Sequence, residues 1–359
     1  MSIKVIHCGD VHIGAQMTAL SRAAAARRAE ILHTFSKICM LCNEENADVL
    51  LISGDLFDSH NIDSTTRDTV KGFFDTLKNT KVFIVPGNHD YLSSGAVLDF
   101  DFGSNVYIFR ETGVCEIENA RIYGIPFLSP YAERFTLPTA ENDGKANILL
   151  MHADLDGGPY NPVTALDLGA TKMDYIALGH VHTASGILHS DRTAYAYCGC
   201  PEPLGFDELG EKGIYIGTVE HGDVKLEFKK ICQREYREVL LDITECEDIN
   251  SIVNEAKSAL IGNGGNLIKL ILTGETNETV DTDYIKTALE NEVYFLRVRN
   301  RTHPKIDLSL LRTEQTLRGI FVDKMLKKIE DGDDREATMT ALYLGLAAFE
   351  GREVDFCEN

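Results

Sequence analysis

Five short stretches of this sequence carry side chains that bind metal ions. They read Asp10-Val11-His12, Gly54-Asp55, Gly87-Asn88-His89-Asp90, Met151-His152-Ala153-Asp154 and Gly179-His180-Val181-His182. Aspartate, histidine and asparagine together suit manganese, iron or zinc, and their oxygen ligands favour the harder ions. The set contains no thiolate, which argues against a structural zinc site. These stretches therefore predict a metal centre.

The spacing within the stretches indicates that they face one pocket. Residues i and i+2 of an extended chain point to the same side. Asp10 with His12, and His180 with His182, are therefore expected to point together. A glycine stands directly before Asp55, Asn88 and His180, and glycine permits close backbone approach and unusual torsion angles.

Each of the five stretches follows a short apolar run that reads as a β-strand. The runs are 4–7, 49–53, 82–85, 148–151 and 175–178. Patterns of helical length lie between the first three runs, at about 22–45 and 63–78. Such alternation predicts an α/β fold with a largely buried sheet. Ligands bind at the carboxyl ends of such strands, because the loops there converge. Residues 105–126 and 194–230 read as short β-rich pieces, suggesting antiparallel hairpins.

The second part of the chain has a different pattern. Strands at 239–243, 267–273 and 294–298 alternate with helices at 249–260 and 282–290, which predicts a small βαβαβ module. Two helices follow, at about 308–330 and 334–350. We expect three domains: 1–232 with the metal centre, 233–303 as a cap domain and 304–359 as C-terminal helices.

Composition limits the classes of protein to which this chain can belong. The 359 residues are 44% hydrophobic and 25% charged, which is ordinary for a soluble globular protein. No apolar run is long enough for a membrane helix, a signal peptide is not expected, and the nine cysteines predict a reduced, cytoplasmic protein. The net charge of −21 argues against binding nucleic acid by overall field. This net charge does not exclude an enzyme that binds phosphate groups through bound metal ions.

The five motifs DxH, GDLFD, GNHD, MHAD and GHVH, in this order, resemble those of the calcineurin-like metallophosphoesterase superfamily. The later Gly199-Cys200-Pro201-Glu202-Pro203 and Gly210-Glu211-Lys212-Gly213 resemble its DNA-repair nuclease branch, the SbcD-like exonucleases. The resemblance is strong over residues 1–230 and looser beyond. It implies a metallophosphoesterase-type β-sandwich flanked by helices.

The resemblance also implies a role for each motif residue. Asp55 would bridge two metal ions. Asp10, His12 and His182 would complete one metal, and Asn88, His152 and His180 the other. His89 would face the scissile phosphate and stabilise charge or protonate the leaving oxygen. Asp90 would orient an imidazole.

The chemistry expected of such a centre is hydrolysis of a phosphodiester. Two cations about 3.5–4 Å apart lower the pKa of a bridging water, hold the phosphate oxygens and neutralise developing charge. A positioned general acid adds typically 10²–10⁴-fold. Manganese is the preferred metal, with iron, zinc or magnesium as alternatives.

One position departs from the nuclease branch. A histidine stands in much of that branch where this sequence has Asp58, whereas the wider superfamily often has aspartate. Either His60 substitutes for that histidine or its role is absent.

Basic and apolar patterns outside the motifs allow two interpretations each. One face of a strand would carry Arg297, Arg299 and Arg301. This face could contact DNA or could simply be exposed to solvent. Arg22, Arg27 and Arg28 could contact substrate or lie on a solvated helix face. The stripe of Leu310, Leu317, Phe321 and Met325 could pack on its own domain or dock onto a partner.

We expect a manganese-dependent DNA nuclease acting in repair, and the resemblance implies an SMC-like ATPase partner and a homodimer. The first alternative is a small-molecule or cyclic-nucleotide phosphodiesterase or phosphatase on the same scaffold, which the acidic charge favours. The second is an assembly subunit with a degenerate metal site. The presence of every expected ligand makes that alternative the weakest.

Overall fold

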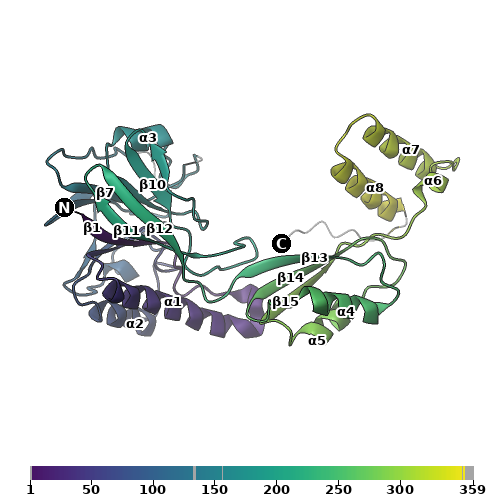
Figure 1. Cartoon of the computed structure of the whole chain (residues 1–359), viewed down its shortest axis with the longest axis horizontal. Helices are drawn as coiled ribbons and strands as arrows, with labels where there is room; N and C mark the ends of the chain where they lie inside the picture. The colour runs from purple at the N-terminus through teal and green to yellow at the C-terminus, as the bar shows by residue number, and fades with distance from the viewer. Residues whose placement is uncertain (1, 132–134, 156, 350, 352–359) are drawn as a thin grey trace. The chain divides into compact units, whose positions relative to one another are not determined.

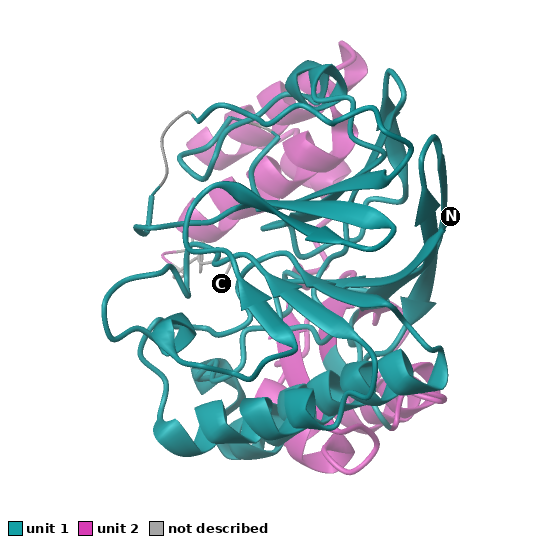
Figure 2. Ribbon diagram, turned by 90° about the vertical axis from the view of Figure 1, so that its left-hand side faces the viewer, with its two compact units in different colours: residues 1–237, 265–268 teal, residues 238–264, 269–359 magenta. Residues whose placement is uncertain are grey.

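The computed structural model describes residues 2–131, 135–155, 157–349 and 351. The chain divides into two compact units (Figure 2). Unit 1 contains residues 1–237 and 265–268, and unit 2 contains residues 238–264 and 269–359. The predicted parts 233–303 and 304–359 both fall mostly in unit 2, so the boundary between them stays a prediction.

Unit 1 contains two six-stranded sheets. The first has the order β12-β11-β1-β2-β3-β4 and the second the order β5-β6-β7-β8-β10-β9. The strands of the first sheet are β1 Ile3–Cys8, β2 Val49–Ile52, β3 Lys81–Ile84, β4 Val106–Ile108, β11 Gly213–Glu220 and β12 Asp223–Lys230. Those of the second are β5 Gly113–Ile117, β6 Ala120–Ile125, β7 Ala146–His152, β8 Tyr175–Gly179, β9 Leu188–Ser190 and β10 Thr193–Tyr197.

A continuous apolar core joins the two sheets into a sandwich. Val5, Leu51 and Phe83 of the first sheet are buried in one cluster with Ile148 and Ala177 of the second. Neighbouring strand residues point to the opposite face of each sheet, and helices lie against those faces (Figure 1). Helices α1 Ala24–Glu44 and α2 Ser64–Asp75 lie on one side, and α3 Ala165–Ala170 lies on the other. The predicted β-sandwich flanked by helices is confirmed.

Parallel pairing aligns the strand ends that carry the motifs. Cys8 of β1 is paired with Ile52 of β2, and Ile52 with Ile84 of β3. In the second sheet His152 of β7 is paired with Gly179 of β8. The carboxyl ends of all five strands therefore lie at one edge of the sandwich. The predicted hairpins are confirmed for β5–β6 and β11–β12. β4 instead joins β3 in parallel, and β10 pairs in parallel with β8 and antiparallel with β9.

The interpretations offered for Arg27 were both wrong. Its side chain is fully buried, and its guanidinium lies 2.9 Å from the buried carboxylate of Glu202 and 2.6 Å from Glu30. A buried arginine needs such partners, because an uncompensated charge inside a protein is costly. Arg27 is therefore part of the packing of α1 rather than of a solvated or substrate-facing surface.

Unit 2 contains most of a third sheet, with the order β13-β14-β15. The element order confirms the predicted βαβαβ module: β13 Tyr236–Asp242, α4 Ile249–Ala259, β14 Leu267–Thr273, α5 Thr282–Leu289 and β15 Phe295–Asn300. Arg297 and Arg299 lie partly buried on β15, and Arg301 follows it, exposed. Their role as DNA contacts stays a prediction.

The predicted helix at 308–330 is two helices, α6 Leu308–Leu311 and α7 Leu317–Glu330, followed by α8 Arg335–Phe349. The break occurs because the Thr316 hydroxyl accepts a bond from the Gly319 N–H and caps a new helix. The break changes the buried face. Leu311 and Val322 pack with α8, whereas Leu310 and Leu317 are 66% and 77% exposed.

Two short 3₁₀ segments, η1 Thr18–Ala23 and η2 Val97–Asp99, complete the helical elements of the described residues. In the part of the chain that the structure describes, every helix is too short or too polar to cross a membrane.

Candidate metal centre

The loops after the five aligned strands bring the predicted metal ligands together. The loop after β1 lies along the loop after β2, since Asp10 donates its N–H to the Gly54 carbonyl and Val11 donates to that of Asp55. The second sheet joins them where the His180 N–H bonds the Asp10 carboxylate at 2.9 Å. Asp10, His12, Asp55 and His180 all have positive φ, a rare conformation that clusters at functional sites.

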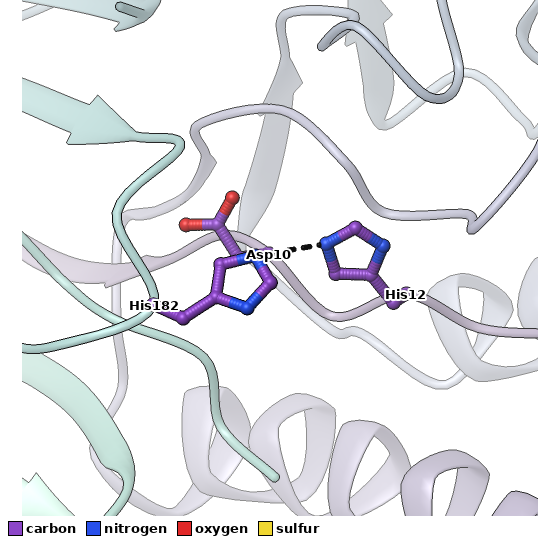
Figure 3. A group of neighbouring side chains, drawn as sticks. All are labelled: Asp10, His12 and His182. Carbon is purple, nitrogen blue, oxygen red and sulfur yellow. Dashed lines mark hydrogen bonds between the residues drawn. The ribbon is translucent and has the colours of Figure 1, made fainter. Parts of the chain in front are cut away.

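Asp10, His12 and His182 form the first predicted ligand group (Figure 3). Their ligand atoms lie within 4.8 Å of one another, although they come from opposite sheets. His12 Nδ1 is 3.1 Å from Asp58 Oδ1, and His182 Nδ1 is 2.6 Å from Glu208 Oε1. A carboxylate only accepts hydrogen bonds, so each Nδ1 carries the proton. In the neutral form of each ring, Nε2 therefore carries a lone pair.

These two lone pairs face each other. His12 Nε2 and His182 Nε2 are 3.1 Å apart, and the dashed line in Figure 3 marks this pair. Two acceptors at this distance repel unless a proton or a cation lies between them. Imidazole nitrogens and a carboxylate converging in this way are a suitable donor set for a divalent transition metal. The residues therefore fit a metal ion.

The second predicted group has the same character. His152 Nδ1 is 3.0 Å from the Ser53 carbonyl oxygen, which can only accept, so His152 Nε2 also carries a lone pair. That nitrogen lies 2.9 Å from Asn88 Oδ1 and 3.4 Å from Asp55 Oδ2. Three acceptors thus converge. His180 lies beside them, with its ring centre 5.1 Å from that of His152.

Asp55 lies between the two groups. Its Oδ2 is 3.4 Å from His152 Nε2 and 3.8 Å from His12 Nε2, while its Oδ1 accepts the backbone N–H of His89 at 2.9 Å. Burial opposes its ionisation, but His152, His12 and His89 hold the pKa of Asp55 below its ordinary value. An ionised carboxylate in this position is suited to bridge two cations.

Carboxylates also change the basicity of the imidazoles. Burial lowers the pKa of His182, but the bond to Glu208 and the charge of Asp10 outweigh burial and raise it to about 9. At His12 burial is outweighed by the bond to Asp58 and by Asp55, so its pKa is raised as well. Burial and the neighbouring His152 lower the pKa of His180.

His89 lies at the open side of the centre. Its ring is exposed and lies edge-on to the ring of His12, with centres 4.8 Å apart. Its Nδ1 donates to the Asp58 carbonyl oxygen at 3.1 Å, which leaves Nε2 for another partner. A nitrogen of His89 also lies within 4.8 Å of ligand atoms of His12 and Asp55.

Asp90 has different partners from those the sequence suggested. Its buried carboxylate accepts the backbone N–H groups of Gly87 at 2.7 Å and Phe57 at 3.1 Å, so it ties two loops together instead of orienting an imidazole. Burial and the charge of Asp55 raise the pKa of Asp90 to about 7. The carboxylates bonded to imidazoles are those of Asp58 and Glu208.

Sequence reasoning missed Glu208 and treated Asp58 only as a departure from the nuclease branch. Asp58 bonds His12 through its side chain and His89 through its carbonyl. His60 lies against the ring of Tyr91, with centres 4.8 Å apart. Glu208 lies between the two glycine-containing motifs at 199–203 and 210–213, but no spacing rule links a glutamate there to His182.

Similarity to known proteins identifies the family of this chain. The profile of the calcineurin-like phosphoesterase family matches residues 3–184, just over half of the chain, so the chain belongs to that family. It is a metallophosphoesterase: members of the family use two divalent metals, and the two ligand groups are the candidate sites.

Three curated proteins show the range of relatives. The chain is 27% identical to the uncharacterized metallophosphoesterase YhaO of Bacillus subtilis, over 89% of this chain and 86% of that protein. It is 25% identical to the DNA double-strand break repair protein Mre11 of Saccharolobus solfataricus, over 60% of each chain. It is also 25% identical to a subunit of the nuclease SbcCD of Escherichia coli, over 63% of this chain and 66% of that one.

Among solved structures, a dimetal phosphatase from Danio rerio has a TM-score of 0.41 and 11% sequence identity, covering 64% of this chain and 99% of that one.

Proposed function

We propose that this protein is a two-metal DNA nuclease that acts in DNA repair. The observation that carries the hydrolase part is the convergence of lone pairs at His12, His182 and His152 around the Asp55 carboxylate. The relatives named for double-strand break repair and for nuclease activity support the DNA part. Manganese is the metal we propose, because nitrogen and oxygen donors are mixed in both groups.

The residues of this chain would divide the work of phosphodiester hydrolysis. Two divalent cations, when bound, supply an activated water and neutralise charge on the phosphate. Asp55 keeps the two ligand groups at a fixed separation. Asp58 and Glu208 orient the imidazoles of His12 and His182. His89, with its Nδ1–H held by the Asp58 carbonyl, would present Nε2 to the leaving oxygen and, as the doubly protonated imidazolium, would donate the Nε2 proton there.

We further propose that the C-terminal helices bind an SMC-like ATPase and that the protein works as a homodimer. Support for a docking surface comes from α6 and α7, where Leu310, Leu317 and Ile320 are 66%, 77% and 51% exposed. Leu317 and Ile320 are three residues apart on α7 and so share one face of that helix, and neighbouring exposed apolar side chains mark interaction surfaces. In unit 2 they are separate from the helical core formed by Leu311 and Val322.

A small-molecule phosphodiesterase is the second candidate. The net charge of −21 favours it, because a DNA backbone is repelled by an acidic surface. Aspartate at position 58 also favours it, since the nuclease branch often has histidine there.

One assay distinguishes the candidates. Purified protein with manganese is incubated with labelled single-stranded DNA, duplex DNA, bis-p-nitrophenyl phosphate and a cyclic nucleotide. We expect DNA cleavage that is abolished in Asp55→Asn, a variant that also excludes a contaminating nuclease. Cleavage of the small diesters with intact DNA would reject the nuclease and support the second candidate.

A further inference from the structure

A row of aromatic rings leads from the metal centre toward solvent. The ring of Tyr160 lies on that of His180, with centres 4.9 Å apart and planes inclined by 43°. The ring of Tyr131 stacks on Tyr160 in turn, at 5.9 Å and 25°. Tyr131 is 65% exposed. The mechanism described above uses neither tyrosine.

The sheet explains why these two tyrosines meet. β6 and β7 are parallel neighbours, with Ile125 paired to Met151, so the loops that follow them leave the same edge. The loop after β6 carries Phe127, whose ring lies 5.6 Å from that of His152. It continues through Leu128, which is 56% exposed, to Tyr131. The loop after β7 carries Tyr160.

The position of Tyr160 is fixed relative to the metal ligands. The buried side chain of Asn161 donates to the carbonyl of His152 at 3.0 Å, and the Asp154 N–H donates to the carbonyl of Tyr160 at 2.9 Å. The residue after Tyr160 is thus tied to the backbone of a predicted ligand. A ring held in this way can position a ligand relative to a phosphate at the centre.

We propose that Tyr160 and Tyr131 form a stacking platform for a nucleobase of an unpaired DNA strand, next to the phosphate that is cleaved. The proposal rests on the nuclease function proposed above and names its substrate as single-stranded DNA or an unpaired end. Bases stack on exposed aromatic rings of single-strand binding proteins with little sequence preference. The net charge of the protein, −21, repels phosphate groups. Stacking of a base on an aromatic ring does not depend on this charge.

The test compares a short single-stranded oligonucleotide with an otherwise identical strand that has abasic units at both ends. Wild type with manganese should cleave the intact strand with about tenfold higher kcat/KM, as loss of one stacked base predicts. Tyr160→Leu, which keeps apolar bulk without an aromatic face, should reduce that ratio to about one. Tyr160→Phe should restore it.

Matched measurements separate the possible failures. Tyr107→Leu removes a 43%-exposed tyrosine from β4 and should retain the wild-type ratio. If wild type cleaves neither strand, the nuclease function is wrong. Two results would reject the platform if wild type cleaves both strands. In the first, Tyr160→Leu keeps the preference for the intact strand. In the second, Tyr160→Leu lowers the cleavage rates of both strands equally and binds manganese more weakly, which would show that Tyr160 only supports His180.

Discussion

Three imidazoles of the metal centre each have one nitrogen held by a group that can only accept a hydrogen bond. For His12 and His182 that group is a carboxylate, and for His152 it is the carbonyl of Ser53. The fixed Nδ1–H directs Nε2, with its lone pair, toward the other ligands. At the residue scale, the acceptors bonded to Nδ1 therefore determine what the motif histidines can bind.

Removing the partner of His182 should weaken metal binding. Glu208→Ala leaves the Nδ1–H without its acceptor, so we expect manganese affinity to fall about 10- to 100-fold. Glu208→Gln should lose less, because its amide oxygen can still accept. Glu211→Gln, at a side chain 63% exposed, is the control. Calorimetric titration measures all four proteins, and equal affinity in Glu208→Ala would reject the orienting role.

The same titration has an expected pH dependence. A cation that binds His182 must displace a proton from its imidazole. The pKa of that imidazole is about 9, because the effects of Glu208 and Asp10 outweigh the effect of burial. Affinity for manganese should therefore rise with pH below about 9, by about tenfold per pH unit for each proton displaced. The dependence should be weaker in Glu208→Ala, because the raised pKa depends on that carboxylate.

His89 should be needed for turnover and not for metal. In His89→Ala we expect kcat to fall about 10²- to 10⁴-fold, the usual contribution of a general acid, with manganese affinity unchanged. His33→Ala, at an exposed histidine on α1, should retain both. Since His89 also lies near His12 and Asp55, loss of metal in His89→Ala would identify it as a ligand and contradict the proposed role.

At the scale of the elements, the centre depends on how closely the strand-end loops approach one another. The loop after β3 runs directly over Asp55. A Cβ atom at Gly87 would lie 2.2 Å from Asp55 Oδ1 and 2.6 Å from its backbone nitrogen. Any side chain at position 87 would therefore force the Asp55 carboxylate out of its place between the two ligand groups.

Gly87→Ala should accordingly displace Asp55 and lower manganese affinity by at least about tenfold, while circular dichroism shows the sheets retained. Gly72→Ala is the matched control. Gly72 lies inside α2, where an added Cβ meets nothing within 4 Å, so that variant should be about 0.5–1 kcal/mol more stable with unchanged affinity. Wild-type affinity in Gly87→Ala would show that the loop can move without affecting the centre.

At the scale of the whole sandwich, a buried histidine joins the two sheets. His7 of β1 bonds Tyr175 of β8 at 2.8 Å and Ser53 at 3.0 Å. Burial lowers its pKa to about 3, against a smaller opposing effect of the Leu178 carbonyl. Between pH of about 6.5 and about 3, His7 is therefore neutral in the folded protein, whereas it is protonated in the unfolded chain.

Because of His7, the free energy of unfolding should decrease in acid. Between pH of about 6.5 and 3 the unfolded state binds the extra proton, so the free energy of unfolding decreases as pH falls, by about 1.4 kcal/mol per unit. His7→Gln should lack this part of the slope. Denaturant unfolding with EDTA, followed by circular dichroism at several pH values, measures the difference. Parallel curves for the two proteins would reject the prediction.

The sequence by itself determined the strands, the βαβαβ module and the five groups of ligands at strand ends. These follow from local patterns: an apolar run makes a buried strand, and the polar residues after it must lie at its carboxyl end. Only the tertiary structure decided that Glu208 holds His182, that Arg27 is buried against Glu202, and that Tyr160 lies on His180. Each of these contacts joins residues far apart in the chain or on separate loops, and tertiary packing, rather than local spacing, brings them together.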